Sequence, residues 1–156
     1  MSDIHFKRLA DDAQSLERFR ELNVLFADAF EEQETYLENP PPDGYLQSLL
    51  AKEHVHVCVA LSGGELAGGL VAYVLDKFEQ QRKEVYIYDL AVASKYRRRK
   101  VATGLIQFVQ AEAQGLGAWV VFVQADPVDT AAVKLYSSLG TREDVFHFDF
   151  TLEERK

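Results

Sequence analysis

Apolar residues recur every three or four positions in several stretches, as expected of helices with one buried face. The clearest stretch is residues 13–30, where Leu16, Phe19 and Leu22 share a face. The run Asn39–Gly44 contains three consecutive prolines and predicts a loop, which we place at the border of a cleft. The predicted helices cover residues 13–30, 45–51 (with Asp43 as cap), 101–115 and 129–139.

Alternating apolar and polar positions in the middle of the chain predict β-strands. Residues 54–61 alternate around three valines, residues 62–65 (SGGE) supply a hairpin turn, and residues 66–75 return as the partner strand. Residues 118–123 are an uninterrupted apolar run, typical of a strand buried on both faces. Further strands are predicted over residues 4–6, 84–92 and 145–150. This mixture over 156 residues predicts one α/β (α+β) domain, residues 1–156.

The charge balance narrows the class of partner. With 25 acidic and 17 basic residues the formal net charge is −8, which disfavours nucleic acid and suits a cationic ligand. The one cysteine, Cys58, lies in an apolar strand and predicts a buried side chain rather than a nucleophile or metal ligand, so no metal site is expected. No segment approaches the length of a membrane span, and we expect a cytoplasmic protein without a membrane partner.

A basic turn, residues 95–100 (KYRRRK), separates the strand over residues 84–92 from the following helix. The first amides of a helix lack intrahelical partners and the macrodipole makes that end positive, so a phosphate or pyrophosphate is stabilised there. Basic side chains at the same end oppose the dipole unless an anion is bound. Such a local conflict is typical of a functional site, and a solvated basic patch is the alternative.

Two stretches resemble the signatures of the GNAT superfamily of N-acetyltransferases. Residues 90–92 (LAV) followed by residues 97–102 (RRRKVA) resemble motif A, whose pattern is (Q/R)-x-x-G-x-(G/A). Residues 129–140 (DTAAVKLYSSLG) resemble the second signature, N-x-x-A-x-x-L-Y-x-x-x-G. Runs such as residues 86–92 (YIYDLAV) are closer still to the type I aminoglycoside 3-N-acetyltransferases. The resemblance covers about residues 20–150.

The resemblance implies a single GNAT-fold domain, with a mixed, mostly antiparallel sheet flanked by helices, that uses acetyl-CoA (coenzyme A). Lys100 stands where motif A has glycine. A lysine there can keep helical backbone angles and still offer its amide to a phosphate, provided that the turn needs no positive φ at this position. The cofactor-binding residues implied are Leu90, Ala91, Val92, Arg97, Arg98, Arg99, Lys100, Val101, Ala102 and Thr103.

In GNAT enzymes the acceptor amine attacks the acetyl thioester directly within a ternary complex. Tyr136 matches the family's general acid, which protonates the leaving thiolate. Without the resemblance, Tyr136 would be interpreted as an aromatic side chain that packs on an amphipathic helix. The amine also needs a base. As amine anchor or base we rank Asp126 first, because it follows a strand at the edge where ligands sit in α/β sheets. Glu84, Asp89 and Asp129 follow in that order.

The resemblance implies a polycationic aminoglycoside as acceptor, which carboxylates around a cleft would recognise. Strand alternation places Glu84, Tyr86 and Tyr88 on the face of Leu90, and Asp89 on the other face unless a bulge re-aims it. The candidate substrate-binding residues are Glu32, Glu79, Tyr86, Tyr88, Asp89, Asp126 and Asp129, the last standing where the second signature has asparagine.

Three other interpretations stay open at this point. A GNAT enzyme could acetylate another amine, such as a polyamine, an amino sugar or a protein terminus. A non-catalytic module could bind acyl-CoA without turning over an acceptor, and the basic turn could bind nucleic acid with a steep salt dependence. A homodimer is compatible with the resemblance.

Overall fold

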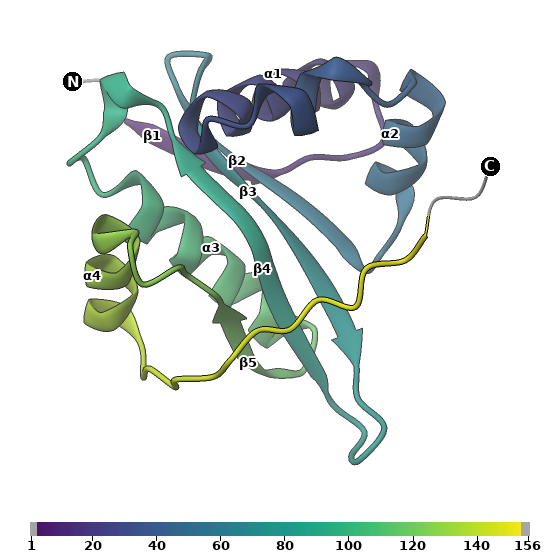
Figure 1. The fold of residues 1–156 in the computed structure, drawn as a ribbon. Coiled ribbons are helices and arrows are strands. Elements are labelled where there is room, and N and C mark those ends of the chain that lie inside the picture. Colours follow the sequence, from purple (N-terminus) through teal and green to yellow (C-terminus); the bar gives the residue numbers. More distant parts are fainter. Residues whose placement is uncertain (1–2, 154–156) are drawn as a thin grey trace. The chain divides into compact units, whose positions relative to one another are not determined.

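The computed structural model describes residues 3–153 and divides the chain into two compact units, Met1–Gln124 and Ala125–Lys156. The first unit contains a five-stranded sheet and three helices among its described residues (Figure 1). Its elements are β1 (Ile4–Arg8), α1 (Ala13–Phe30), the π-helical turn η1 (Glu34–Glu38), α2 (Asp43–Ala51), β2 (Val55–Ser62), β3 (Glu65–Asp76), β4 (Lys83–Val92), the 3-10 turn η2 (Ser94–Tyr96), α3 (Val101–Gly115) and β5 (Ala118–Val123).

The sheet has the strand order β1-β2-β3-β4-β5. All neighbouring strands are antiparallel except β4 and β5, which run parallel. The predicted mixed, mostly antiparallel sheet is therefore confirmed. Pairing between β4 and β5 stops at Ile87 and Val123, where β5 ends, whereas β4 continues to Val92 and so extends beyond β5.

Helices cover both faces of the sheet, and two adjacent glycines of β3 show which helix lies where. A Cβ atom on Gly68 would lie 3.2 Å from Val101 Cγ1 of α3, and one on Gly69 would lie 2.6 Å from Leu22 Cδ1 of α1. Because successive residues of a strand point to opposite faces, α1 and α3 pack on opposite sides of β3. Glycine at both positions lets the helices approach the strand this closely.

The core on the α1 face is built from the apolar residues that the sequence pattern placed inward. Phe19, Leu22 and Phe26 of α1 pack with Val57 and Val59 of β2 in one buried cluster. The helix follows Asp12, whose carboxylate accepts a hydrogen bond from the Ser15 N–H at 2.7 Å. Its bounds equal those predicted. Cys58 is buried, as predicted, and burial raises its pKa to about 12, which leaves the thiol protonated and inert.

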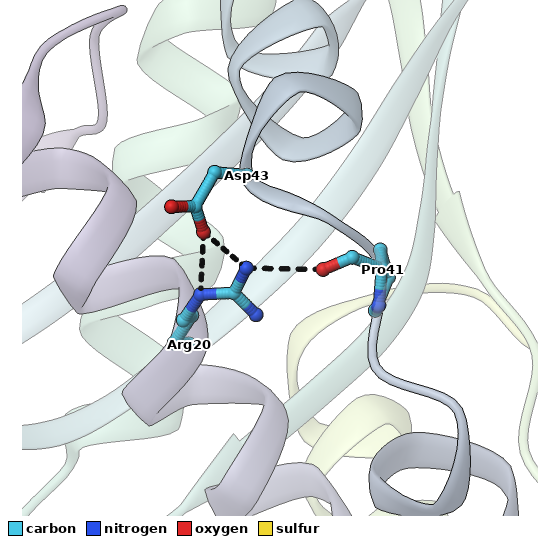
Figure 2. A network of polar contacts seen from close by, with 3 residues as sticks. All are labelled: Arg20, Pro41 and Asp43. Atoms are coloured by element: carbon cyan, nitrogen blue, oxygen red, sulfur yellow. Dashed lines mark hydrogen bonds and ion pairs between the residues drawn. The ribbon is translucent and has the colours of Figure 1, made fainter.

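The proline loop is tied to α1 by one arginine (Figure 2). Arg20 Nε donates to Asp43 Oδ1 at 3.1 Å, and Arg20 Nη2 donates to the Pro41 carbonyl at 3.0 Å. The prediction that Asp43 caps a helix beginning at Tyr45 is wrong, because α2 begins at Asp43 itself after Pro42. The Asp43 carboxylate pairs with Arg20 instead and so ties the start of α2 to α1.

β5 differs from the prediction of a strand buried on both faces. Within the first unit its residues are only partly buried, and the Trp119 side chain is 55% exposed. The reason is topological: β5 comes last in the strand order and has a neighbour, β4, on one side only among the residues described.

The second unit, described by itself, contains the helix α4 (Thr130–Leu139). Residues 145–150 carry no regular secondary structure, and residues 125–153 hold no other strand with which they could pair, so the strand predicted there stays a prediction. No helix in the described part of either unit has the length and apolar character needed to cross a membrane.

Candidate active site

A β-bulge decides which side chains of β4 face α1. Val71 of β3 is opposite Asp89, while the next residue, Ala72, is opposite Ile87, so Tyr88 is the extra residue. The bulge shifts Asp89 onto the face that carries Tyr86 and Glu84, the face covered by α1. The same shift places Leu90 opposite Leu70, on the α3 face, which corrects the expectation that Leu90 shares a face with Tyr86.

The re-aimed Asp89 carboxylate is half-buried, and a tyrosine contacts it. Tyr36, from η1, donates its hydroxyl hydrogen to Asp89 Oδ2 at 2.7 Å. Burial raises the pKa of Asp89, the Tyr36 hydrogen bond opposes that rise, and the nearby Glu32 carboxylate adds to it. Glu32 and Asp89 are therefore close enough for their charges to interact, and their role in substrate binding stays a prediction. Tyr36 was missed, because nothing in the polar segment 34–38 marks its aromatic residue as a partner for a strand 53 positions away.

Asp89 lies at a cleft of about 190 Å³ between α1, α2 and the sheet. Phe19, Phe26, Leu46 and Val71 are among its apolar walls, and Pro41 also lines it, which confirms that the proline loop borders a cleft. Two further tyrosines line it, Tyr73 and Tyr88, whose rings meet edge to face at 6.0 Å. A carboxylate in a mostly apolar cleft favours a cationic ligand, because few other groups there can compensate its charge.

On the other side of the bulge, the far end of β4 has an open edge. β4 residues beyond Ile87 have no strand on the β5 side among the residues described. Backbone N–H and C=O groups are strong hydrogen-bonding groups that require partners when buried. The edge formed by residues 88–92, which includes the predicted Leu90, Ala91 and Val92, is therefore suited to a ligand that pairs like a strand.

The basic turn leads directly from this edge to α3. Lys100, the residue before the helix, has φ 60° and ψ 26°, and Arg98 has φ 63°, so both lie in the left-handed region. The condition that the turn needs no positive φ at Lys100 is therefore not met. Position 100 requires the conformation that glycine adopts most easily, which accounts for glycine in motif A. Among the described residues no side chain caps α3, so the N–H groups of its first turn, at Val101, Ala102 and Thr103, face the basic turn without a capping group.

One basic side chain of the turn is already paired. Lys95 Nζ donates to Glu65 Oε2 at 2.9 Å, and the Tyr96 hydroxyl donates to the same oxygen at 2.5 Å. Within the described residues no ion pair involves the four that follow, which are Arg97, Arg98, Arg99 and Lys100. These four cations, the uncapped helix and the open β4 edge together fit a ligand with a phosphate-bearing end and an amide-bearing arm.

Two of the predicted acidic residues have other partners. Trp119 Nε1 donates to Glu84 Oε2 at 2.9 Å, and Lys77 Nζ lies 3.7 Å from the Glu84 carboxylate. Glu79 lies in the hairpin beyond the β3–β4 ladder, where Lys77 and Arg82 flank it at 3.8 and 3.6 Å. Neither side chain contacts Asp89 in the part of the chain that the structure describes, so their roles as base and substrate ligand stay predictions.

Tyr86, another predicted substrate residue, lies next to the bulge. Its ring stacks on Phe122 with centroids 4.7 Å apart, and its hydroxyl donates to Gln124 Oε1 at 2.7 Å. Its ring also meets that of Tyr88 at 5.8 Å. These contacts fix the ring of Tyr86 beside the exposed Tyr88, so two of the predicted aromatic residues form one surface with Asp89.

The second unit carries the other candidate residues. Asp129 caps α4 by accepting a hydrogen bond from the Ala132 N–H at 3.1 Å, so its carboxylate has the structural role expected of a cap. Burial and, secondly, Asp129 raise the pKa of Tyr136, which keeps the phenol protonated near neutral pH. Asp126 accepts a hydrogen bond from the Asp129 N–H through its backbone carbonyl, and its side chain is exposed within this unit. Among residues 3–153 no group of His, Cys, Asp or Glu side chains is placed to hold a metal ion.

Comparisons with known proteins agree with these features. The sequence profile described as the acetyltransferase (GNAT) family matches residues 19–141. A crystal structure of an aminoglycoside acetyltransferase from an uncultured soil metagenomic sample is 43% identical, with a TM-score of 0.92 over 97% of this chain and 99% of that one. Another, from the same kind of sample and in complex with sisomicin, is 34% identical, with a TM-score of 0.89 over 96% of this chain and 97% of that one.

A curated relative is more distant. The N-acetyltransferase family 8 member 2 of Rattus norvegicus is 25% identical in an alignment 114 residues long that covers 64% of this chain. The match spans half the length of that relative. It supports the acetyltransferase fold and does not bear on the acceptor.

Proposed function

Because the chain belongs to the acetyltransferase (GNAT) family, we propose that it transfers the acetyl group of acetyl-CoA to an amine of an aminoglycoside antibiotic. The observation that carries the proposal is the half-buried Asp89 carboxylate, whose pKa the nearby Glu32 also raises, at a mostly apolar cleft. The two similar aminoglycoside acetyltransferases support the acceptor class. Following the type I enzymes that the sequence resembles, we assign the 3-amino group as the acceptor and antibiotic resistance as the result.

The residues present fit acetyl-CoA. The uncapped amides at residues 101–103 and the cations of residues 97–100 suit its phosphates, and the open β4 edge at residues 88–92 suits its amide-bearing arm. When bound, acetyl-CoA would supply the acetyl thioester, with coenzyme A as the leaving thiol once the acetyl group is on the amine. The backbone N–H groups at the β4 edge would stabilise negative charge on the carbonyl oxygen in that step.

The protons move through two side chains of this chain. Asp89 binds the acceptor ammonium and takes one of its protons, so that the nitrogen carries a lone pair for attack. A carboxylate with a raised pKa is a better base than an ordinary one, and burial raises that of Asp89. Tyr136 gives its phenolic proton to the departing thiolate, and Asp126 is a second anchor for the polycation. A cytoplasmic location, which suits the lone Cys58 thiol, and a homodimer belong to the same proposal.

Thiol release in the presence of acetyl-CoA tests the proposal. We expect release with sisomicin and gentamicin, with kcat/KM at least about tenfold above that for spermidine, and only slow release without acceptor. The variant Asp89→Asn should lose most of this rate. Glu17→Gln, which neutralises an exposed carboxylate of α1 that does not line the cleft, should keep it.

Other outcomes would identify the alternatives. Turnover of spermidine with none of the aminoglycosides would contradict the acceptor class and leave a GNAT enzyme for another polyamine. Coenzyme A binding without turnover of any amine would contradict the enzymatic role and identify an acyl-CoA-binding module.

A further inference from the structure

The hydrogen bond between Tyr36 and Asp89 joins two parts of the first unit that are far apart in sequence. Tyr36 belongs to η1, a π-helical turn, and Asp89 follows the bulge of β4. Both irregularities are needed for the contact: the bulge aims Asp89 toward α1, and the turn carries Tyr36 back over the sheet. π-helical turns and bulges are over-represented at functional sites.

The ring of Tyr36 is held by aromatic packing on α1. Its centroid lies 5.9 Å from that of Phe26 and 6.1 Å from that of Phe30, and those two rings stack at 5.6 Å. Phe26 is buried, so this cluster belongs to the rigid core. A clamped ring fixes the direction in which its hydroxyl donates, so Tyr36 determines the orientation of the Asp89 carboxylate rather than following it.

The contact leaves one oxygen of Asp89 open. Oδ2 accepts from Tyr36, whereas residues 3–124 supply no hydrogen-bond donor to Oδ1. The titratable groups that face Asp89 from the packed elements are the Glu32 carboxyl and the phenols of Tyr36, Tyr73, Tyr86 and Tyr88. None of them carries positive charge, so within this unit the Tyr36 hydroxyl is the group that stabilises the carboxylate.

Burial also fixes the direction of this hydrogen bond. Burial, and secondly the bond to Asp89, raise the pKa of Tyr36, so the phenol stays protonated over the whole physiological range. It therefore donates at every pH at which the enzyme would work. The hydrogen bond lowers the pKa of Asp89 against the effect of burial, which keeps a charged carboxylate available to a cation.

We infer that Tyr36 is a positioning residue of the acceptor site, which holds Oδ2 of Asp89 and thereby directs Oδ1 toward the acceptor ammonium. The inference rests on the proposed function, because it takes Asp89 as the group that receives the amine. It adds a residue outside both family signatures and outside β4. The alternative is that Tyr36 serves only to pack the end of α1.

The variant Tyr36→Phe separates these roles, because it keeps the ring and removes the hydroxyl. We expect kcat/KM for sisomicin to fall by about tenfold at pH ~7, since a hydrogen bond to a charged group is lost. The loss should shrink as the pH rises, because the pKa of Asp89 increases in the variant and the acidic limb of the kcat/KM profile moves to higher pH. In an Asp89→Asn background the same substitution should change kcat/KM by less than about twofold.

Tyr45→Phe is the matched control, because Tyr45 lines the same cleft and has no hydrogen bond to Asp89 among the contacts of the described residues. Whatever its effect on rate, its acidic limb should coincide with that of the wild type. A Tyr36→Phe variant that lost the same factor at every pH, or whose loss added fully to that of Asp89→Asn, would overturn the inference and leave packing as the role of Tyr36.

A readout without turnover keeps the two proposals apart. The Asp89 carboxyl can be titrated by carbon NMR in wild type and in Tyr36→Phe, without acetyl-CoA or acceptor. A higher pKa in the variant supports the positioning role even if no aminoglycoside is acetylated, in which case the proposed function alone fails. An unchanged titration overturns the positioning role even if aminoglycosides are good substrates.

Discussion

Replacing Lys100 separates two effects of this residue at the start of α3. Its backbone is left-handed, with φ 60° and ψ 26°, a conformation that costs a non-glycine residue roughly 1–2 kcal/mol. Its side chain adds a cation to a helix end that already carries Arg97, Arg98 and Arg99. Lys100→Gly removes both the backbone strain and the cation. Lys100→Ala removes the cation and keeps the strain.

The expected magnitudes follow from this geometry. Glycine relieves the strain but gains roughly 0.4–1 kcal/mol of conformational freedom in the unfolded chain, so Lys100→Gly should be more stable than Lys100→Ala by about 0.5–1 kcal/mol. For a chain of this size that difference raises Tm by about 2 °C. Both variants lose one exposed contact to phosphate, about 1 kcal/mol, so coenzyme A should bind about fivefold more weakly to each.

Wild type, Lys100→Gly and Lys100→Ala are compared in two assays. Thermal unfolding followed by circular dichroism measures the effect of backbone strain, and calorimetric titration with coenzyme A measures the loss of affinity. The loss of affinity should shrink at high salt, because exposed charges are screened there. Equal Tm values for the glycine and alanine variants would refute the argument from backbone strain. Unchanged coenzyme A affinity in both would refute a phosphate contact by the Lys100 side chain.

Three further substitutions test other parts of the site. Asp89→Asn should lower kcat/KM by at least about a hundredfold. It should also raise Tm near neutral pH, because burial raises the pKa of Asp89 and disfavours its charge in the folded state; this gain should disappear as the pH falls through that pKa and the wild-type carboxyl is protonated. The Tm of Asp89→Asn and of wild type, measured over a series of pH values, checks the sign of this difference. A lower Tm for Asp89→Asn at neutral pH would contradict it. Tyr136→Phe should lower kcat by about a hundredfold and leave coenzyme A affinity unchanged in a parallel calorimetric titration, whereas an unaltered kcat would remove Tyr136 as the acid. Gly104→Ala should lower Tm by several degrees, about 1–3 kcal/mol, because its Cβ would lie 2.2 Å from Phe6 Cζ; a neutral result would show that Phe6 moves freely.

The layout of elements in the first unit could be predicted because it depends on local patterns. The α1 helix has the predicted bounds, since its apolar period persists over its whole length and Asp12 supplies a cap. The β2–β3 hairpin follows from the two glycines of its turn, both with positive φ. The basic turn was placed correctly between β4 and α3, because the spacing of apolar residues changes from that of a strand before the turn to that of a helix after it.

The geometry of the site depends on features with no local signature. The bulge at Tyr88 reverses the face of Asp89, and strand alternation alone predicts the opposite face. The sequence does not indicate the left-handed backbone of Lys100, because lysine rarely adopts positive φ and its presence therefore predicts ordinary backbone angles. The contact of Tyr36 with Asp89 is a tertiary contact between a polar-looking turn and a strand. Strand alternation was the reason for ranking Asp89 below Asp126 and Glu84, and the bulge removes that reason. Which of the three acts as the base stays a prediction.

The central claim is that an aminoglycoside amine receives the acetyl group, and the product of the reaction tests it most directly. Purified protein is incubated with acetyl-CoA and sisomicin, and the product is examined by mass spectrometry and two-dimensional NMR. We expect a single product that is heavier than sisomicin by one acetyl group, with the new amide at the 3-amino position. Recovery of unmodified sisomicin, under conditions in which the protein binds coenzyme A, would contradict it.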